Sequence, residues 1–553
     1  MSTQLEQIKT DQLNLGWYAV DEHGVIRYKT DPESTDPNEL KSFETVCLTP
    51  MVPTAILENV DTGEEKVEIS YRVNRRIKTL VIDRETLVNK NKVVGLARYG
   101  IAVGSVNSGK VAAFFTEVLG RSESLPRKLS KSSLGWVGTK REYFLPYSDG
   151  FVLDNQSDPH VIELIEAFKA KGDRDAWMER MRLLRKHMTV RVAMGASFAS
   201  PIVSCIGQNP FIMHIWGGSG LGKTLLLKLI MSIWGNPNST QLVRSLNTTQ
   251  NALMSQASFL QHIPLAGDEL QTIKTRYANY DNLIMDITEG ANRGRLGPDG
   301  KPIRVLTWRN AFLTCGEEPI CKQDSGGGAF ARVVEIELLN KYVSDGNELA
   351  NFLADNYGFA AQEFITELMR PVALGGYDLS VIYRDYFGKL MSDGTLNEKQ
   401  AGAGALIMVA DFIASMRFWK GEPELTEDDM MPFLKSADTV DVTERAYKAV
   451  AGMVVQYSAN FAEEPKEAWG RWDGNEVYIL KSVLSERMLK MGFDWEACKK
   501  KWKNKGYIRT GRDGRMQHYV SICGHPAYCI CFVMPKDPSE SEELTEHNGE
   551  IPF

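Results

Sequence analysis

Several features that mark common protein classes are scarce or missing in this sequence of 553 residues. Its eight cysteines are scattered too widely for a disulfide framework, which indicates a reducing compartment. The opening residues, MSTQLEQIKTDQ, contain no apolar segment of the kind that a secretory signal needs. The most apolar stretch, Val192–Ile206, is short and is followed by Gln208-Asn209-Pro210, so we predict a buried helix and no membrane span. These absences predict a cytoplasmic protein without a membrane partner.

Other absences exclude further classes. No period of 20–50 residues repeats along the chain, which argues against a solenoid. Residues 1–150 contain no zinc-type cysteine set and no acidic triad, so a fused primase is not expected. The length is too great for one hydrophobic core and predicts three or four domains.

A net charge of −7 argues at first against nucleic acid, but the charge is unevenly distributed. Residues 471–535 carry twelve Lys or Arg against six Asp or Glu, whereas residues 537–553 carry six acids and neither Lys nor Arg. A basic module followed by an acidic tail makes the total charge a poor guide to partners.

Changes in hydrophobic period divide the chain. Alternation in KVEISYRV (66–73) and IKTLVI (77–82) around Asn74-Arg75 predicts a hairpin, and SLGWVGTKREYFLP (133–146) predicts two more short strands. From residue 209, strands and helices alternate as in a parallel sheet covered by helices. We therefore predict an α/β protein with a loosely ordered start (1–40), a β-rich domain (41–158), a helical linker (159–208), a sheet-and-helix core (209–344), a helical region (345–470), a basic module (471–535) and an acidic tail (536–553).

One stretch predicts a nucleotide site. FIMHIW (211–216) is a short apolar strand, GGSGLGKT (217–224) is a glycine-rich loop, and the following residues are helical, as the P-loop motif requires. Backbone N–H groups of such a loop surround phosphate oxygens, Lys223 reaches the outer phosphates, and Thr224 binds Mg²⁺. The predicted contacts to ATP are Gly217, Gly218, Ser219, Gly220, Leu221, Gly222, Lys223 and Thr224. A second match, GSVNSGKV (104–111), ends in Val111, which cannot bind Mg²⁺, and is expected to be an ordinary turn before a helix.

A pair of acids follows a second apolar strand in HIPLAGDEL (262–270). Asp268 is expected to hold Mg²⁺ through water, and Glu269 to orient or deprotonate the attacking water. The alternative is an Asp-Glu pair that merely starts a helix. A small-molecule kinase needs no such glutamate, so the pair favours hydrolysis.

The next segments carry candidate DNA-binding and catalytic residues. ANRGRLGPDGKPIRV (291–305) is predicted to form a hairpin that turns at GPDG and carries Arg293, Arg295, Lys301 and Arg304. The strand in LTWRNAFLTCGEE (306–318) offers Thr314 and Glu317 to a γ-phosphate or its water. Arg332, in GGGAFARVVEIEL (326–338), lies where an arginine finger can act on a neighbouring subunit's nucleotide. Each arginine taken alone is equally consistent with a solvated charge.

The basic module (476–520) is predicted to form a helix, a glycine turn, a basic helix and a strand pair around GRDG, which is the order of a winged helix. Such a cluster of cations gives DNA affinity with little sequence information, whereas the alternative is a solvated helix face. The candidate contacts are Lys499, Lys500, Lys501, Lys503 and Lys505 on the helix, and Arg512 and Arg515 beside the expected wing tip.

Two features near the end of the chain remain. His518, Cys523, His525, Cys529 and Cys531 are spaced poorly for zinc, so buried thiols are the favoured interpretation. The stretch EELTEHNGEIPF (542–553) resembles the acidic tip of bacterial single-stranded DNA-binding proteins. Ile551, Pro552 and Phe553 are therefore candidates for recruiting host replication proteins, and the alternative is a solubilising tail.

Together these motifs resemble the helicase-like branch of the AAA+ ATPases, which includes the viral superfamily-three and MCM helicases. A closer resemblance is to a prophage and mobile-element family long labelled a domain of unknown function, whose characterised relatives are self-loading replicative helicases. The resemblance rests on the P-loop, on the acids of GDEL that follow it in the chain, and on several shorter stretches. These are ARYGIAVG (97–104), GWVG (135–138), FLP (144–146), RVAMGASFASPI (191–202), EGANRGRLGPDG and FLTCGEE.

This resemblance implies an AAA+ P-loop ATPase core with a β-rich N-terminal domain and a C-terminal winged helix. It implies an ATP-dependent, ring-forming DNA helicase in a bacterial host, a hexamer by expectation, acting on single-stranded or forked DNA. It also implies Asp268 and Glu269 for hydrolysis, Thr314 at the sensor position, and Arg332 as a finger acting between subunits. The sensor position is usually Asn in AAA+ proteins, which this chain does not have. An origin-binding or helicase-loading ATPase shares these residues, and a protein-directed AAA+ switch or defence NTPase is a third alternative.

Overall fold

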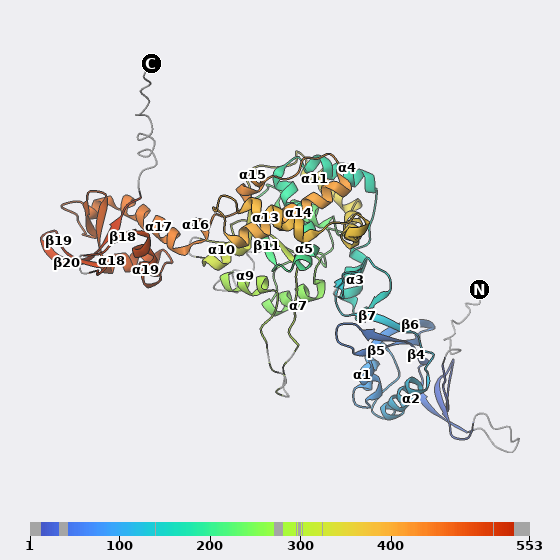
Figure 1. Ribbon diagram of the computed structural model, residues 1–553. Helices are drawn as coiled ribbons and strands as arrows, with labels where there is room; N and C mark the ends of the chain where they lie inside the picture. The colour runs from blue at the N-terminus through green and yellow to red at the C-terminus, as the bar shows by residue number, and fades with distance from the viewer. Residues whose placement is uncertain are drawn as a thin grey trace.

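The computed structural model describes residues 13–31, 42–138, 140–269, 280–294, 304–322, 325–511 and 514–535, together with residues 296, 300 and 302. These residues form three lobes that follow one another in chain order (Figure 1). Helix α3 (Pro159–Ala167) leads from the N-terminal lobe into the large central lobe, and α16 (Ala437–Val440) and α17 (Val442–Gln456) lead on to the C-terminal lobe. Each lobe has its own cluster of buried apolar side chains.

The N-terminal lobe is built on a five-stranded sheet in the order β10-β7-β4-β5-β6, with a smaller sheet of β1, β2 and β3 beside it. As predicted, β5 and β6 form an antiparallel hairpin, and Asn74 and Arg75 at its turn have φ angles of 53° and 64°. The elements are β1 (Tyr18–Asp21), β2 (Gly24–Tyr28), β3 (Phe43–Cys47), β4 (Met51–Asn59), β5 (Glu65–Val73), β6 (Arg76–Asp83), α1 (Arg84–Val88), η1 (Val93–Tyr99), α2 (Ser108–Arg121), β7 (Arg127–Lys131) and β10 (Phe151–Leu153).

Part of the start that we predicted to be loosely ordered is folded. Strands β1 and β2 pair antiparallel, and Tyr18 packs edge-on against Phe114 of α2 with ring centroids 5.1 Å apart. Gly24 turns with a φ of +141°, where a Cβ atom would lie 2.1 Å from the carbonyl oxygen of Cys47. The polar composition of residues 1–40 concealed this short apolar alternation, which the contact with α2 stabilises.

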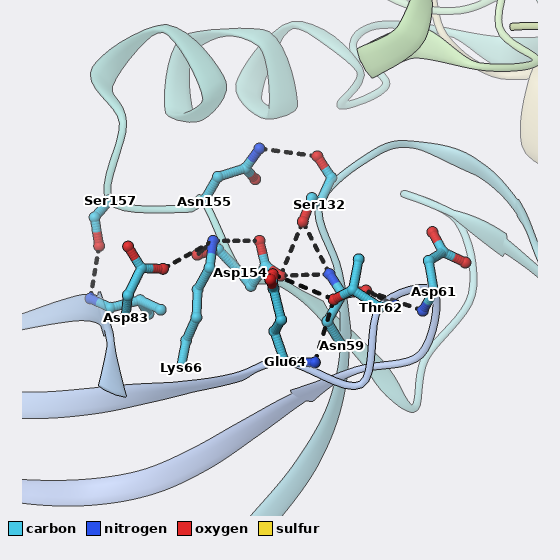
Figure 2. Close-up of polar contacts among 11 residues, drawn as sticks. Asn59, Asp61, Thr62, Glu64, Lys66, Asp83, Ser132, Asp154, Asn155 and Ser157 are labelled. Atoms are coloured by element: carbon cyan, nitrogen blue, oxygen red, sulfur yellow. Dashed lines mark hydrogen bonds and ion pairs between the residues drawn. The ribbon is translucent and has the colours of Figure 1, made fainter. Parts of the chain in front are cut away.

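A polar cluster fixes the junction between the N-terminal and central lobes (Figure 2). The chain crosses there three times, because it leaves β7 for the central core, returns to form β10 and leaves again into α3. The buried Asp154 carboxylate accepts hydrogen bonds from Asn59 Nδ2 at 2.7 Å and Ser132 Oγ at 3.0 Å, and pairs with Lys66 Nζ at 3.0 Å. Ser157 Oγ accepts a further bond from the backbone N–H of Val81 in β6. The segments that leave β7 and β10 are thus tied to one carboxylate and to the N-terminal sheet.

The first part of the central lobe matches its sequence pattern. The predicted strands β8 (Gly135–Val137) and β9 (Tyr143–Leu145) pair antiparallel and pack into the central core. The charged helix α4 (Arg174–Leu184) precedes the apolar helix α5 (Met188–Ile206), which is buried as predicted and ends at Gly207, whose φ is 75°.

A parallel sheet in the order β12-β13-β14-β11-β15 forms the middle of the central lobe, which confirms the expected α/β class. All five strands run in the same direction, so their carboxyl ends meet at one edge, where ligands of such sheets bind. The elements are β11 (Phe211–Gly217), α6 (Lys223–Met231), β12 (Val243–Ser245), α7 (Gln250–Leu260), β13 (Leu265–Asp268), α9 (Tyr280–Glu289), β14 (Ala311–Gly316), α10 (Gly327–Arg332) and β15 (Val333–Leu338).

Helices complete the central lobe, as the sequence predicted. Helix α14 packs along α5, and both are long and apolar enough to span a membrane by length and composition, yet 78% of each apolar window is buried in the protein. Within this core Asp411 of α14 pairs with Arg191 at 2.6 Å and Arg185 at 2.9 Å. The helices are α11 (Gly346–Asp355), α12 (Ala360–Met369), η2 (Val372–Leu374), α13 (Leu379–Leu390), α14 (Glu398–Phe418), α15 (Glu427–Met430) and η3 (Met431–Phe433).

The C-terminal lobe differs from its prediction in two respects. EVYIL (476–480), expected to start a helix, is strand β17, which pairs with β20. The expected strand pair around GRDG does not form, because β18 and β19 both pair with β20 and the hairpin turn lies at Cys523-Gly524. The elements are η4 (Ser458–Phe461), β16 (Gly470–Asp473), β17 (Glu476–Leu480), α18 (Lys481–Lys490), α19 (Trp495–Lys505), β18 (Ile508–Arg509), β19 (Gln517–Ile522) and β20 (His525–Val533).

Candidate nucleotide site and its surroundings

The glycine-rich loop lies at the carboxyl edge of the central sheet, between β11 and α6. Gly217 has a φ of +145°, and a Cβ atom there would lie 2.6 Å from the carbonyl oxygen of Leu338. Gly222, with a φ of +96°, forms the N-cap of α6 and faces the ring of Tyr342, whose hydroxyl donates to the Gly222 carbonyl at 3.1 Å. The loop therefore needs glycine at both ends and is held by a buried tyrosine.

Lys223 and Thr224 open α6, where unpaired backbone N–H groups and the helix dipole favour an anion. The ammonium group of Lys223 folds back over the loop and donates to the carbonyl oxygens of Gly217 at 3.0 Å and Gly218 at 2.8 Å. The Lys223 cation and the unpaired N–H groups at the start of α6 thus lie beside the same loop.

The predicted acids lie directly across from this helix start. Asp268 is the last residue of β13, and its Oδ1 accepts hydrogen bonds from Thr224 Oγ1 at 3.3 Å and from the backbone N–H of Glu269 at 2.9 Å. Glu269 has a positive φ of 57°, an uncommon conformation for a non-glycine residue and one that strained active-site residues share.

A pocket of about 520 Å³ brings these groups together. Its walls come from the glycine-rich loop, the start of α6, the ends of β13 and β14, and the first turn of α11. The lining residues that carry chemistry are Ser219, Lys223, Thr224, Lys228, Asp268, Glu269, Cys315 and Glu317. The volume suits a drug-sized ligand such as a nucleotide.

The residues present fit a triphosphate and Mg²⁺. The Thr224 hydroxyl and the Asp268 carboxylate supply oxygen ligands, which Mg²⁺ prefers, and two cations face the same space. Within the described part of the chain no cluster of three or more His, Cys, Asp or Glu side chains is arranged to hold a metal. Mg²⁺ keeps several waters and shares phosphate oxygens, so the two protein oxygens of Thr224 and Asp268 are compatible with it.

Thr314, predicted to touch the γ-phosphate, points elsewhere. It is 4% exposed in the middle of β14, and its hydroxyl lies 2.9 Å from Nδ1 of His214 on the neighbouring strand β11. The next residue, Cys315, lines the pocket instead, and its thiol donates to Asp268 Oδ1 at 2.7 Å. Burial and the adjacent Asp268 carboxylate raise the pKa of Cys315, so the thiol stays protonated. The sequence indicated Thr314 and gave no sign of Cys315. Because adjacent residues of a strand point to opposite faces, the register of β14 alone decides which of the two meets the pocket.

Arg332 lies at the opposite edge of the sheet from the pocket. It ends α10 directly before β15, whose Val333 pairs with Ile212 near the start of β11, whereas the glycine-rich loop follows the end of β11. The length of β11 separates the two edges by about 20 Å at a strand rise of about 3.3 Å per residue. The Arg332 side chain is 11% exposed, and its guanidinium donates to the Gly328 carbonyl at 2.9 Å and pairs with Glu289 at 3.2 Å. The geometry does not bring Arg332 to the pocket of its own chain.

The basic hairpin is described only in part. Ala291 bridges Thr307 and Leu296 bridges Pro302, both antiparallel, as a hairpin requires. Arg293 pairs with Asp286 at 3.2 Å, and Arg304 is exposed. Arg295 and Lys301 lie outside the described residues.

The lysines of α19 fall into two groups. Lys505 pairs with the buried Glu444 of α17, and Lys501 lies 3.6 Å from Asp441. Lys499 pairs with Glu496 one turn earlier on the same helix, Lys500 is exposed, and Lys503 donates to the carbonyl of Gly514 at 3.4 Å.

The loop beside α19 and the end of the chain complete the predicted residues. Arg515 lies in the loop between β18 and β19 and not at a hairpin tip, whereas Arg512 and the 551–553 motif fall in segments that the structure does not describe. Cys529 and Cys531 are buried, as predicted, and burial raises their thiol pKa values to about 11 and about 12. Cys523, by contrast, is exposed, because it lies at the β19–β20 turn.

Comparison with known proteins gives two family matches. Residues 18–304, more than half of the chain, match the family described as Domain of unknown function (DUF927). Residues 441–537 match the Cch helix turn helix domain.

One solved structure and two curated proteins are also similar to this chain. The solved structure of "SCCmec type IV Cch - active helicase" has a TM-score of 0.67 and 18% identity over 94% of this chain and 98% of that one, so the two share a fold. The chromosomal replication initiator protein DnaA of Streptococcus agalactiae, serotypes Ia and V, is 31% identical over 136 residues, which are 24% of this chain and 27% of the relative. The chain thus spans about a quarter of the length of these curated relatives.

Proposed function

The chain belongs to the DUF927 family, and from that premise we propose that it is an ATP-dependent DNA helicase that acts in the replication of a phage or mobile genetic element. The observation that carries the proposal is the pocket in which Lys223 and Thr224 face Asp268 and Glu269. A nucleotide-binding protein that only senses ATP does not need a carboxylate placed to activate water. The fold shared with a protein described as an active helicase supports the same conclusion.

Six residues of the pocket have a role in hydrolysis under this proposal. Lys223 and the loop N–H groups bind and orient the β- and γ-phosphates, and Thr224 and Asp268 hold Mg²⁺, which supplies charge stabilisation of the phosphates when bound. Glu269 accepts a proton from the attacking water. Cys315, through its hydrogen bond, fixes the Asp268 carboxylate toward Thr224. Glu317, on the pocket wall, is a second acid within reach of that water.

We assign an AAA+ core to residues 209–344, with residues 345–470 as its helical continuation. Residues 41–158 are assigned as the N-terminal domain and residues 159–208 as the helical linker, with two exceptions: β1 and β2 belong to the N-terminal lobe, and β8 and β9 pack into the central core. The parallel sheet with its glycine-rich loop after β11 supports the first assignment. Residues 471–535 are assigned as a winged helix, on the order α18, α19 and the β19–β20 hairpin.

The position of Arg332 supports action between subunits. An arginine that lies about 20 Å from its own loop along β11 serves ATP only if a neighbouring copy brings its pocket to that edge. Repeating this head-to-tail contact closes a ring, and six copies is our expectation. The hairpin cations, Arg293 and Arg304 among them, would then face the DNA in the channel, and the cations of α19 would hold the flanking duplex.

A strand-displacement assay tests the proposal. Forked duplexes with a 3′ or a 5′ tail, one strand labelled, are incubated with ATP and the full chain. We expect displacement from one of the two forks, and a loss of roughly 100-fold or more in Glu269→Gln, since general-base catalysis contributes about 10²–10⁴-fold. Glu269→Gln should still bind nucleotide and DNA. The matched control is Glu337→Gln, an exposed glutamate on β15 outside the pocket.

Strand displacement that persists in Lys223→Ala would show that this ATP site does not drive unwinding.

A second function is favoured by the similarity to DnaA, a replication initiator. In that case the chain binds DNA and hydrolyses ATP, but neither fork is opened until another helicase is added. The same assay separates the two, because only the first function predicts displacement by this chain alone.

A further inference from the structure

A second cleft, of about 830 Å³, lies between the central and C-terminal lobes. One wall comes from the segment around Lys322 and from Phe330 of α10, and the other comes from α17 and α18. Five cations line it, and none of its lining residues is Asp or Glu. Two of the cations have carboxylate partners just outside the cleft, because Lys322 pairs with Glu318 and Lys490 with Glu486. The cations are Lys322, Arg445, Lys448, Arg487 and Lys490.

The floor of this cleft is apolar. Phe330, Met453, Tyr457, Met491 and Phe493 line it between the cations. Two of the guanidinium groups are held against aromatic rings: Arg445 lies 4.1 Å from the Phe330 ring centroid, and Arg487 lies 3.9 Å from that of Trp469. An apolar floor with a cationic rim suits a ligand that carries carboxylates beside apolar side chains. A phosphate backbone would leave the methionines and rings without partners.

Residues 537–553, which lie beyond the described part of the chain, have the complementary composition. They carry six carboxylates and no Lys or Arg, and they end in Ile551, Pro552 and Phe553. The segment follows β20, whose last residue, Val533, accepts a hydrogen bond from Tyr447 Oη on α17 at 2.9 Å.

Residues 537–553 are long enough to reach the cleft from the end of β20. Lys448 and Gln456 of α17 line the cleft within nine residues of Tyr447, which is about 14 Å along a helix. Seventeen extended residues span up to about 58 Å.

We propose that residues 537–553 dock in this cleft of the same chain and join the central lobe to the C-terminal lobe. The carboxylates pair with the rim cations, and Ile551 and Phe553 fill the apolar floor. Because the segment is tethered, its effective concentration at the cleft is millimolar, so a weak contact suffices. Docking would also withhold the rim cations from other anions. This inference does not depend on the proposed helicase activity.

Photo-cross-linking tests it on the full chain. In Phe553→p-benzoylphenylalanine, irradiation should join residue 553 to Met453 or Met491, located by mass spectrometry. The double change Lys448→Glu with Lys490→Glu, both exposed lysines, should lower the yield at least about tenfold, and 1 M salt should lower it as well because salt screens the charge pairs. The matched control Lys466→Glu reverses an exposed lysine away from the cleft and should leave the yield unchanged.

Three outcomes would overturn the proposal. The first is an absence of cross-links to cleft residues. The second is cross-links only between isotopically labelled and unlabelled copies in a mixture, which would place the segment on another chain. The third is charge reversal that leaves the yield unchanged but weakens binding of a fluorescent single-stranded oligonucleotide, which would make the cleft a nucleic-acid site. Lys223→Ala should retain the cross-link, so this result is independent of the ATPase.

Discussion

His262 lies between the β8–β9 hairpin and the central sheet, and its environment fixes its protonation. Its Nδ1 accepts a hydrogen bond from the backbone N–H of Trp136 at 3.1 Å. Burial lowers the His262 pKa to about 3, and the nearby cations Lys131, Arg141 and Arg309 act in the same direction. The native state therefore requires a neutral imidazole.

This requirement predicts a pH dependence of stability. The unfolded chain protonates His262 below about pH 6.5. The folded chain resists protonation down to about pH 3. The stabilisation is thus complete above pH 6.5 and falls with pH by up to about 1.4 kcal/mol per unit in that window. Urea unfolding at pH 6.5 and pH 5 should show a loss of up to about 2 kcal/mol that is absent in His262→Gln, which keeps an acceptor for Trp136. Equal losses in both proteins would refute this role.

At this scale the sequence predicted the groups of the pocket but not their orientation. Lys223, Thr224, Asp268 and Glu269 converge because each ends or follows a parallel strand at the carboxyl edge of the sheet, and that rule needs no coordinates. Thr314 and Cys315 were confused because adjacent strand residues face opposite sides, and one position of register decides which meets the pocket. No motif marks Cys315, since its role arises only from its distance to Asp268.

Among the elements, the β5–β6 turn holds two non-glycine residues in the left-handed region, Asn74 at 53° and Arg75 at 64°. Asn tolerates that conformation, whereas Arg is strained by about 1 kcal/mol. Arg75→Gly should therefore stabilise the N-terminal lobe by about 0.5–1 kcal/mol. Arg76→Gly, one position later at the start of β6, should destabilise it by a similar amount. The urea midpoint measures both, and shifts of the same sign would contradict the turn geometry.

Helix α19 yields a second prediction at this scale. Lys500 and Lys503 are exposed, whereas Lys505 pairs with Glu444 of α17. Each phosphate contact that is lost should lower the slope of log affinity against log salt by about 0.9. Lys500→Ala with Lys503→Ala should thus reduce the slope for duplex DNA by about two, measured by fluorescence anisotropy at several salt concentrations. Lys505→Ala is the control. It should lower the urea midpoint of unfolding, because the pair with Glu444 is lost, and should change the salt slope of DNA binding little.

Elements with a strong local period were predicted correctly, and those defined by distant partners were not. The β5–β6 hairpin, the β8–β9 pair and α5 each contain their own pattern or turn. EVYIL fits a helix or a strand equally well, and only its pairing with β20, about fifty residues later, makes it β17. The pairing of both β18 and β19 with β20 is likewise a long-range property that no turn residue announces.

For the whole molecule, the separation of Arg332 from the pocket predicts complementation. Lys223→Ala and Arg332→Ala should each lose ATPase activity, the second by about 10³-fold or more if the arginine acts as a finger. An equal mixture of the two should regain up to about a quarter of the wild-type rate, because one interface in four then combines an intact loop with an intact arginine. Measuring phosphate release from the mixture, with each variant alone as control, checks this. A mixture as inactive as its components would show that Arg332 does not act between copies.

The three chain crossings at Asp154 have a mechanical consequence. A single linker lets two bodies swivel about its bonds, whereas three crossings, two of them bonded to each other through Asp154 and Ser132, resist twisting as well as bending. A motor that pulls on a polymer experiences an equal and opposite force. A flexible junction between its lobes would twist with each step instead of transmitting that force. The junction in Figure 2 therefore joins the N-terminal lobe stiffly to the central lobe. We expect the two lobes to rotate together as one rigid body.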